Sequence, residues 1–216
     1  MNAAARGGDR LDLFLILLAM AYLAFVGLGG VGHEWYASAD RVTDDGKVWL
    51  LFTSALNVVV ELDEVQWVLL ALTTGAVIYR LGPRLWWAVA LSGHVVSAIV
   101  SYVLIEIAVA FGSGSAAASA RESDYGISIV LASGLGALLA SALLARGRSG
   151  GRMDTGDRVA LCCGLLGLAG MLAVSFGWYD SQHLIGFVIG FFLTRYLVER
   201  RTWGIASGEG VFETPR

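Results

Sequence analysis

The chain has 216 residues, of which 56% are hydrophobic and only 15% are charged, and its mean hydropathy is +0.68. This composition excludes an ordinary soluble domain and is typical of an integral membrane protein, so we expect the lipid bilayer as a partner. The net charge of −3 and its distribution give no indication of nucleic-acid binding, and we expect no nucleic-acid partner.

Apolar stretches predict six membrane-spanning helices, because a helix needs about 20 apolar residues to cross a bilayer. A polar N-terminal segment at 1–10 precedes them, and a short tail at 199–216 follows them. The fold class that we predict is therefore an all-α membrane protein, with one six-helix bundle over residues 11–198. In chain order, the predicted spans cover residues 11–30, 65–79, 85–111, about 124–145, 159–176 and 183–197.

Arginines lie at alternate ends of the predicted spans, whereas the other connecting loops are mostly acidic. By the positive-inside rule, the arginine-rich ends face the cytoplasm. We therefore expect a multi-pass protein of the cell (plasma) membrane with both termini cytoplasmic. The arginines that carry this prediction are Arg6, Arg10, Arg80, Arg84, Arg146, Arg148, Arg152, Arg158, Arg200 and Arg201.

The longest predicted loop, at 31–64, lies outside the cell in this orientation and is not uniformly polar. Its apolar run at 49–60 has 12 residues, which is too short to span a bilayer. Such a run is typical of an interfacial or re-entrant segment. We expect it to form a roof over the outer end of the bundle.

The third predicted span carries a polar stripe that should face the inside of the bundle. His94, Ser97, Ser101 and Tyr102 recur at helical spacing, and polar side chains in a membrane helix avoid the lipid. His94 has two interpretations: a structural hydrogen bond to the fourth or fifth helix, or a second polar group in a reactive cavity.

The fourth predicted span has small or polar residues every four positions, which indicates close packing at the centre of the bundle. Asp124 stands at its start and Ser128 one turn later. Asp124 has two interpretations, an N-cap of this helix or a catalytic acid. The stripe consists of Asp124, Ser128, Ala132, Gly136 and Ala140.

A histidine opens the last predicted span. His183, Gly186 and Gly190 fall on one face of a helix, and the two glycines let another helix approach closely. An ionisable residue in a membrane helix is a functional-site hypothesis by default. The alternative is a core histidine that binds a backbone carbonyl.

Ser128 and His183 each stand about one turn from the outer start of a span, so they lie at comparable depth. A serine within hydrogen-bond reach of a histidine makes a nucleophile with its general base. We therefore select these two residues as the catalytic candidates. Because the three histidines are scattered and none forms a helical pair with a glutamate, we expect no metal and no cofactor.

These motifs resemble those of a known family. Gly126 and Ser128 at the start of one span, with His183, Gly186 and Gly190 at the start of the last, are similar to the motifs of the rhomboid intramembrane serine proteases. These motifs are even more similar to those of a rhomboid-like group found mainly in actinobacteria. It has a Gly-His in the third helix, an Asp-x-Gly-x-Ser segment and a late histidine, which Gly93-His94, Asp124 to Ser128 and His183 match.

The resemblance covers about residues 11–198 and implies a six-helix rhomboid bundle. It implies a serine endopeptidase in which Ser128 attacks a peptide bond of a transmembrane substrate and His183 moves the proton. The substrate protein would arrive from the lipid, past the fifth helix.

The chain also departs from the usual rhomboid pattern. Ile129 follows the serine where the family has glycine, and Leu50 and Ile78 replace a loop arginine and a second-helix glutamate. The family's oxyanion-binding histidine and asparagine fall nearest to Leu62 and Gln66. Gln66, His94 and Asp124 are therefore the candidates for the oxyanion site or its cavity.

Two functions follow from this pattern. The first is intramembrane proteolysis by the Ser128–His183 pair. The alternative is a catalytically inactive rhomboid-fold protein that binds membrane segments, which the departures favour. A small transporter or channel would need an inverted repeat or a pair of broken helices, and the sequence has neither.

Overall fold

The computed structural model describes residues 3–30, 35–56, 63–124, 126–173, 177–178 and 180–206, and within these it is helical apart from turns and one isolated β-bridge. Its elements are α1 (Ala3–Gly27), α2 (Ala39–Thr43), α3 (Leu50–Thr53), the 3₁₀ turn η2 (Ser54–Leu56), α4 (Asp63–Leu81), α5 (Pro83–Ala110), α6 (Gly114–Ser119), α7 (Ile127–Arg148), α8 (Thr155–Ala173) and α9 (Asp180–Ala206).

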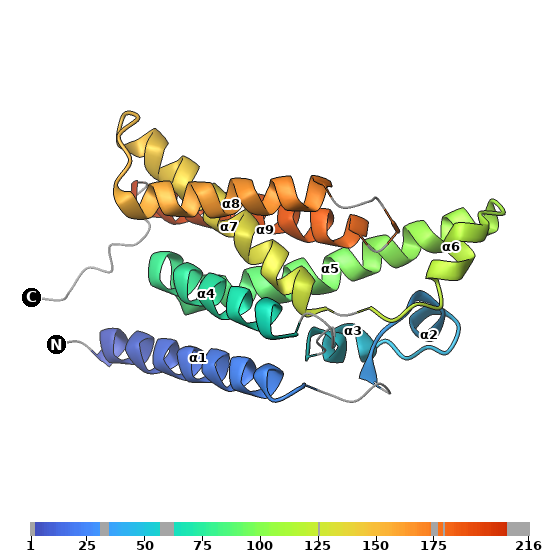
Figure 1. Cartoon of the computed structure of the whole chain (residues 1–216). Helices are drawn as coiled ribbons and strands as arrows, with labels where there is room; N and C mark the ends of the chain where they lie inside the picture. The colour runs from blue at the N-terminus through green and yellow to red at the C-terminus, as the bar shows by residue number, and fades with distance from the viewer. Residues whose placement is uncertain are drawn as a thin grey trace, which may run out of the picture.

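The long helices form a bundle in which successive helices run in opposite directions (Figure 1). The short helices α2, α3 and α6 gather at one end, where α4, α7 and α9 begin. We call this the short-helix end. Because helices that begin at the same end expose their first turns there, this end brings together residues far apart in the sequence.

The predicted all-helical fold is confirmed for the described residues, apart from one isolated β-bridge. Among the described residues, five helices are long and apolar enough to cross a membrane. The second predicted span, at 65–79, falls within α4, which is not one of the five because Asp63 and Glu64 open it and Arg80 nearly ends it. The five stretches are Asp9–Gly27, Pro83–Ala110, Ile127–Arg148, Thr155–Ala173 and Ser181–Arg200.

Several helix boundaries in the structure differ from the predicted ones. The fourth span begins at Ile127 rather than at about residue 124, and the last helix continues to Ala206, beyond the start of the predicted tail. A short helix, α6, forms within the predicted loop at 112–123. The apolar run at 49–60 starts as α3 and η2, while its remainder, 57–60, lies outside the described residues.

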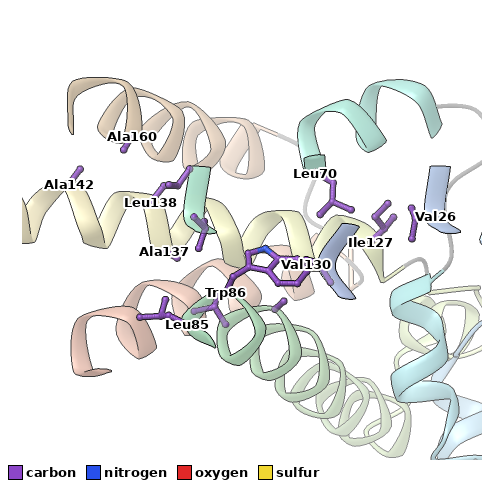
Figure 2. Close-up of a cluster of buried hydrophobic side chains, with 14 residues drawn as sticks. Val26, Leu70, Leu85, Trp86, Ile127, Val130, Ala137, Leu138, Ala142 and Ala160 are labelled. Atoms are coloured by element: carbon purple, nitrogen blue, oxygen red, sulfur yellow. The ribbon is translucent and has the colours of Figure 1, made fainter. Parts of the chain in front are cut away.

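Helix α7 is the centre of the bundle. Its apolar stretch is 72% buried, against 11% for that of α1. Figure 2 shows α7 running through a cluster of buried side chains, with Trp86 of α5 and Leu70 of α4 on its sides and Ala160 of α8 near its far end. The alanines and glycines of α7 make this possible, because small side chains let several helices reach one axis.

Glycines set the distance between α7 and α9. A Cβ placed on Gly190 would lie 2.0 Å from the Ser133 carbonyl oxygen, and one on Gly136 would lie 2.1 Å from that of Phe187. A Cβ on Gly186 would lie 2.8 Å from Cγ2 of Ile129. The two backbones therefore touch at Gly136 and Gly190, where only glycine fits, and Gly186 leaves room for the Ile129 side chain.

Arg80 joins three helices at the opposite end of the bundle. Its guanidinium donates to the carboxylate of Asp157 on α8 and to Oγ of Ser141 on α7, the latter at 3.3 Å. The ion pair is largely buried, with 18% and 12% of the two side chains exposed. This pair fixes α4 and α8 to the end of α7, away from the residues described next.

The close contact of α7 and α9 predicts that Gly190→Ala destabilises the bundle. The added methyl group meets the Ser133 carbonyl, which is backbone and cannot rotate away, so we expect a loss of at least about 2 kcal/mol in the free energy of unfolding. Denaturant titration in detergent micelles measures it. Gly75→Ala in α4 is the matched control, because its Cβ meets no atom within 4 Å. Equal losses in both variants would contradict the prediction.

Candidate active site

The structure brings Ser128 and His183 together at the short-helix end. Ser128 is the second residue of α7, and His183 lies in the first turn of α9. Nε2 of the imidazole is 2.7 Å from Oγ of the serine, and both side chains are half-buried. At this distance the imidazole can take the serine proton, so the geometry is that of a nucleophile and its base.

The contact between α7 and α9 produces this geometry. Gly186 follows His183 by about one turn, and its missing side chain leaves room for Ile129, the neighbour of Ser128. A larger residue at Gly186 would push α9 away from α7 at the level of the serine. The glycine face that the sequence indicates is thus what allows the imidazole to reach the hydroxyl.

A cavity of about 390 Å³ opens beside Ser128 and His183. Its walls come from α7 and α8, and Gln66 of α4 is the third polar residue that lines it. The Oε1 atom of Gln66 is buried and has no hydrogen-bond partner among the described residues. The other lining residues are apolar or glycine: Leu131, Ala132, Leu135, Leu166, Gly167, Gly170 and Met171.

His94 does not line this cavity. It is 1% exposed, and its Nε2 shares a 3.1 Å hydrogen bond with Oγ of Ser54 in η2. Gly126 packs against its ring so closely that a Cβ there would lie 2.1 Å from Cε1. The Gly126 N–H in turn donates to the Ser54 carbonyl at 3.0 Å. Of the two interpretations, the structure supports a structural role, in which His94 supports the segment before α7. The predicted partner is wrong, because the hydrogen bond goes to Ser54 in η2 and not to the fourth or fifth predicted helix.

Asp124 is not the N-cap of α7, and this interpretation is wrong. The capping position belongs to Gly126, which makes no side-chain cap bond. The helix starts later than the spacing suggests, because the backbone of Asp124 pairs with Ala37, to which its N–H donates at 2.8 Å. The side chain points instead to α5 and α9, where it accepts hydrogen bonds from Tyr102 O–H at 2.6 Å and from Gln182.

Gln182 and Ser54 also support the region around Ser128 and His183, and neither was among the residues predicted from the sequence. Gln182 is 1% exposed and Ser54 is completely buried. The sequence does contain a pattern that indicates Gln182: a polar residue at the start of an apolar helix, beside a histidine, needs a buried hydrogen-bond partner. No sequence pattern indicates Ser54, because its hydrogen-bond partner His94 lies 40 residues away in the chain.

Comparisons with family models, with curated proteins and with solved structures return no match. In the described part of the chain, no group of three or more His, Cys, Asp or Glu side chains could hold a metal ion.

The burial of Asp124 predicts a pH-dependent stability. Burial raises the pKa of Asp124 to about 6, although the hydrogen bonds from Tyr102 and Gln182 lower it. The folded chain thus binds a proton that the unfolded chain releases near pH 4. The contribution of Asp124 to stability is therefore greatest below pH 4, falls as the pH rises to about 6, and is level above that, with a change on the order of 3 kcal/mol.

The measurement is the difference in unfolding free energy between the wild type and Asp124→Asn at several pH values from 4 to 7. Because asparagine cannot ionise, the wild type should lose stability relative to this variant as the pH rises. A constant difference across the range would show that the carboxyl has no shifted pKa.

Proposed function

We propose that this chain is an intramembrane serine protease of the rhomboid type. The 2.7 Å hydrogen bond between His183 Nε2 and Ser128 Oγ carries the proposal. A buried hydroxyl and imidazole can meet for structural reasons alone, but this pair is half-buried and opens to a cavity. A nucleophile needs such an opening, because its substrate must reach the oxygen.

The reaction follows the chemistry of a serine acyl transfer. Ser128 Oγ attacks the carbonyl carbon of a peptide bond while His183 Nε2 accepts the hydroxyl proton. The carbonyl oxygen takes the negative charge. When the tetrahedral intermediate collapses, the C–N bond breaks and His183 gives the proton to the leaving amine. Water then attacks the acyl-serine while His183 accepts its proton. The bond between the acyl carbon and Ser128 Oγ breaks, the new carboxyl terminus leaves, and His183 returns the proton to Oγ, so the enzyme is restored without a cofactor.

Two groups are placed to stabilise the negative charge on the carbonyl oxygen. The backbone N–H of Ser128 lies in the first turn of α7, where the helix dipole favours an anion. The amide of Gln66 lines the same cavity, and its NH₂ group can donate to an oxyanion. Gln66 thereby takes the place of the asparagine that the usual rhomboid enzymes carry.

The cavity wall favours an apolar substrate. Apart from Ser128, His183 and Gln66, it is lined by hydrophobic residues and glycines of α7 and α8, so a transmembrane protein is the substrate class that fits it. Helix α8 has only 17% of its apolar stretch buried. A substrate helix could therefore approach from the lipid along this loosely packed side, with the unwound peptide bond entering the cavity.

The membrane placement in this proposal uses six spans, with α4 as a short sixth helix among the five apolar ones. The short-helix end faces outside the cell. It carries Ser128 and His183, which we call the reactive pair. The opposite end carries the arginine-rich turns, so both termini are cytoplasmic in the plasma membrane.

The alternative is an inactive rhomboid-fold protein that binds membrane segments. Ile129 favours it, because this residue is 1% exposed against α9 where the usual enzymes have glycine after the serine. A side chain there makes the first turn of α7 more rigid. In this function Ser128 and Gln66 would offer hydrogen bonds to the backbone of a bound helix.

Labelling with a fluorophosphonate distinguishes the two functions, because this probe reacts only with an activated serine. We expect the wild type to be labelled and both Ser128→Ala and His183→Ala to lose the label. Ser133→Ala is the matched control: Ser133 is a buried serine of the same helix whose hydroxyl donates to its own helix backbone, so the variant should label normally. Folded wild type that takes no label would support the inactive binder.

Gln66 gives a second test of the proteolytic function. Gln66→Leu keeps the approximate size but removes the amide, so we expect the rate of substrate cleavage to fall by about 10²–10³, as for other oxyanion donors. The effect should appear in kcat, because the donor acts on the transition state. An unchanged kcat would leave the Ser128 backbone as the oxyanion site and exclude Gln66.

A further inference from the structure

Close in sequence to Ser128 and His183 lies a fully buried cluster of polar side chains that the proposed chemistry does not use. Tyr102 of α5, Asp124 before α7 and Gln182 of α9 are 2%, 4% and 1% exposed. The Asp124 carboxylate accepts hydrogen bonds from both of the others, at 2.6 Å from the Tyr102 hydroxyl. Three separate segments of the chain thus converge on one carboxylate.

This cluster and the reactive pair are connected twice through the backbone. Asp124 precedes Ser128 by four residues, and Gln182 is the direct neighbour of His183. The Asp124–Gln182 and Ser128–His183 hydrogen bonds therefore close a ring of short chain segments. Both hydrogen bonds thus join the start of α9 to the chain at the start of α7.

The backbone around Asp124 is held by hydrogen bonds of its own. The Asp124 N–H donates to the Ala37 carbonyl at 2.8 Å, and nearby the Asp40 N–H donates to the Ala120 carbonyl at 3.1 Å. These bonds tie the segment before α7 to Ala37, which precedes α2, and to Asp40 in the first turn of α2. A buried carboxylate with good partners is rigid, because each lost hydrogen bond would leave an unsatisfied polar group.

We propose that Asp124 is a positioning residue that holds the starts of α7 and α9 against α5 and so sets the distance between Ser128 and His183. This inference rests on the proposed function for its catalytic meaning. Asp124 does not line the cavity, so it acts on the reaction through Gln182 and the backbone. A shift of about 1 Å between reacting groups can change a rate 10²-fold. Hydrogen bonds that fix the distance between Ser128 and His183 therefore affect catalysis.

The choice of variants separates positioning from chemistry. Asp124→Ala removes both hydrogen bonds. Asp124→Asn keeps them, because its Oδ1 accepts from Tyr102 and its NH₂ can donate to Gln182 after the glutamine amide turns over. Gln182→Leu and Tyr102→Phe each remove one partner. Ser101→Ala is the matched control: Ser101 is buried beside Tyr102, and its Oγ has no hydrogen-bond partner among the described residues.

Two readouts are taken on the full chain in nanodiscs, well below the unfolding temperature. The first is the rate constant of fluorophosphonate labelling at Ser128. We expect a decrease of at least about tenfold in Asp124→Ala and a smaller one, within about threefold, in Asp124→Asn. The double variant Asp124→Ala/Gln182→Leu should be no slower than the slower single one, since both remove the same bond.

The second readout is hydrogen–deuterium exchange at the starts of α7 and α9, which needs no activity. Asp124→Ala should speed exchange at both helix starts, and Asp124→Asn and Ser101→Ala should not. If Asp124→Ala does not fold, Tyr102→Phe is the milder test, with a smaller change in the same direction.

Each remaining outcome has one meaning. If Asp124→Asn labels as slowly as Asp124→Ala with normal exchange, the carboxylate takes part in the chemistry and the inference is overturned. If Asp124→Ala only lowers the unfolding temperature and leaves both readouts unchanged, its role is merely structural and the inference is again overturned. If the wild type takes no label but exchange changes as expected, the positioning role stands and the proposed protease function fails.

Discussion

The direct contact between the backbones of α7 and α9 is the constraint on which the site depends. In a membrane, helices gain little from burying apolar side chains, so close van der Waals packing must hold them together. Gly136, Gly186 and Gly190 let the two helices meet with carbonyl oxygens where side chains would otherwise stand. The same closeness brings the His183 ring within hydrogen-bond distance of Ser128. Packing and the candidate chemistry therefore have one cause.

Buried polar groups hold the bundle at both of its ends. At the short-helix end, His94 binds Ser54, and Asp124 binds Tyr102 and Gln182. At the opposite end, Arg80 joins Asp157 and Ser141. Each of these contacts links residues of different helices or segments. Because an unpaired polar group in an apolar surrounding is strongly unfavourable, such pairs fix which helices lie side by side more specifically than apolar contacts do.

The sequence supported the prediction of the helices, the central role of the fourth span and the pairing of a serine with a histidine. Hydrophobic length predicts a span, and spacing of three and four residues predicts a face; both are local properties. The prediction was wrong about Asp124, because an acidic residue before a helix looks the same whether it caps that helix or reaches α5 and α9. The role of His94 could not be decided from the sequence, because the hydrogen-bond partner of His94, Ser54, lies in another segment.

By itself, the sequence determined an all-helical fold with helices long and apolar enough to cross a membrane, the last of which carries a histidine on a smooth, glycine-lined face. It also placed Ser128 and His183 near the same end of the bundle, since both open helices that start there. Only the tertiary structure decided that the two faces meet, that Gln66 shares their cavity and that His94 does not. The physical reason is that depth along a helix follows from residue count, whereas the rotation and the neighbour of each helix depend on contacts between distant segments.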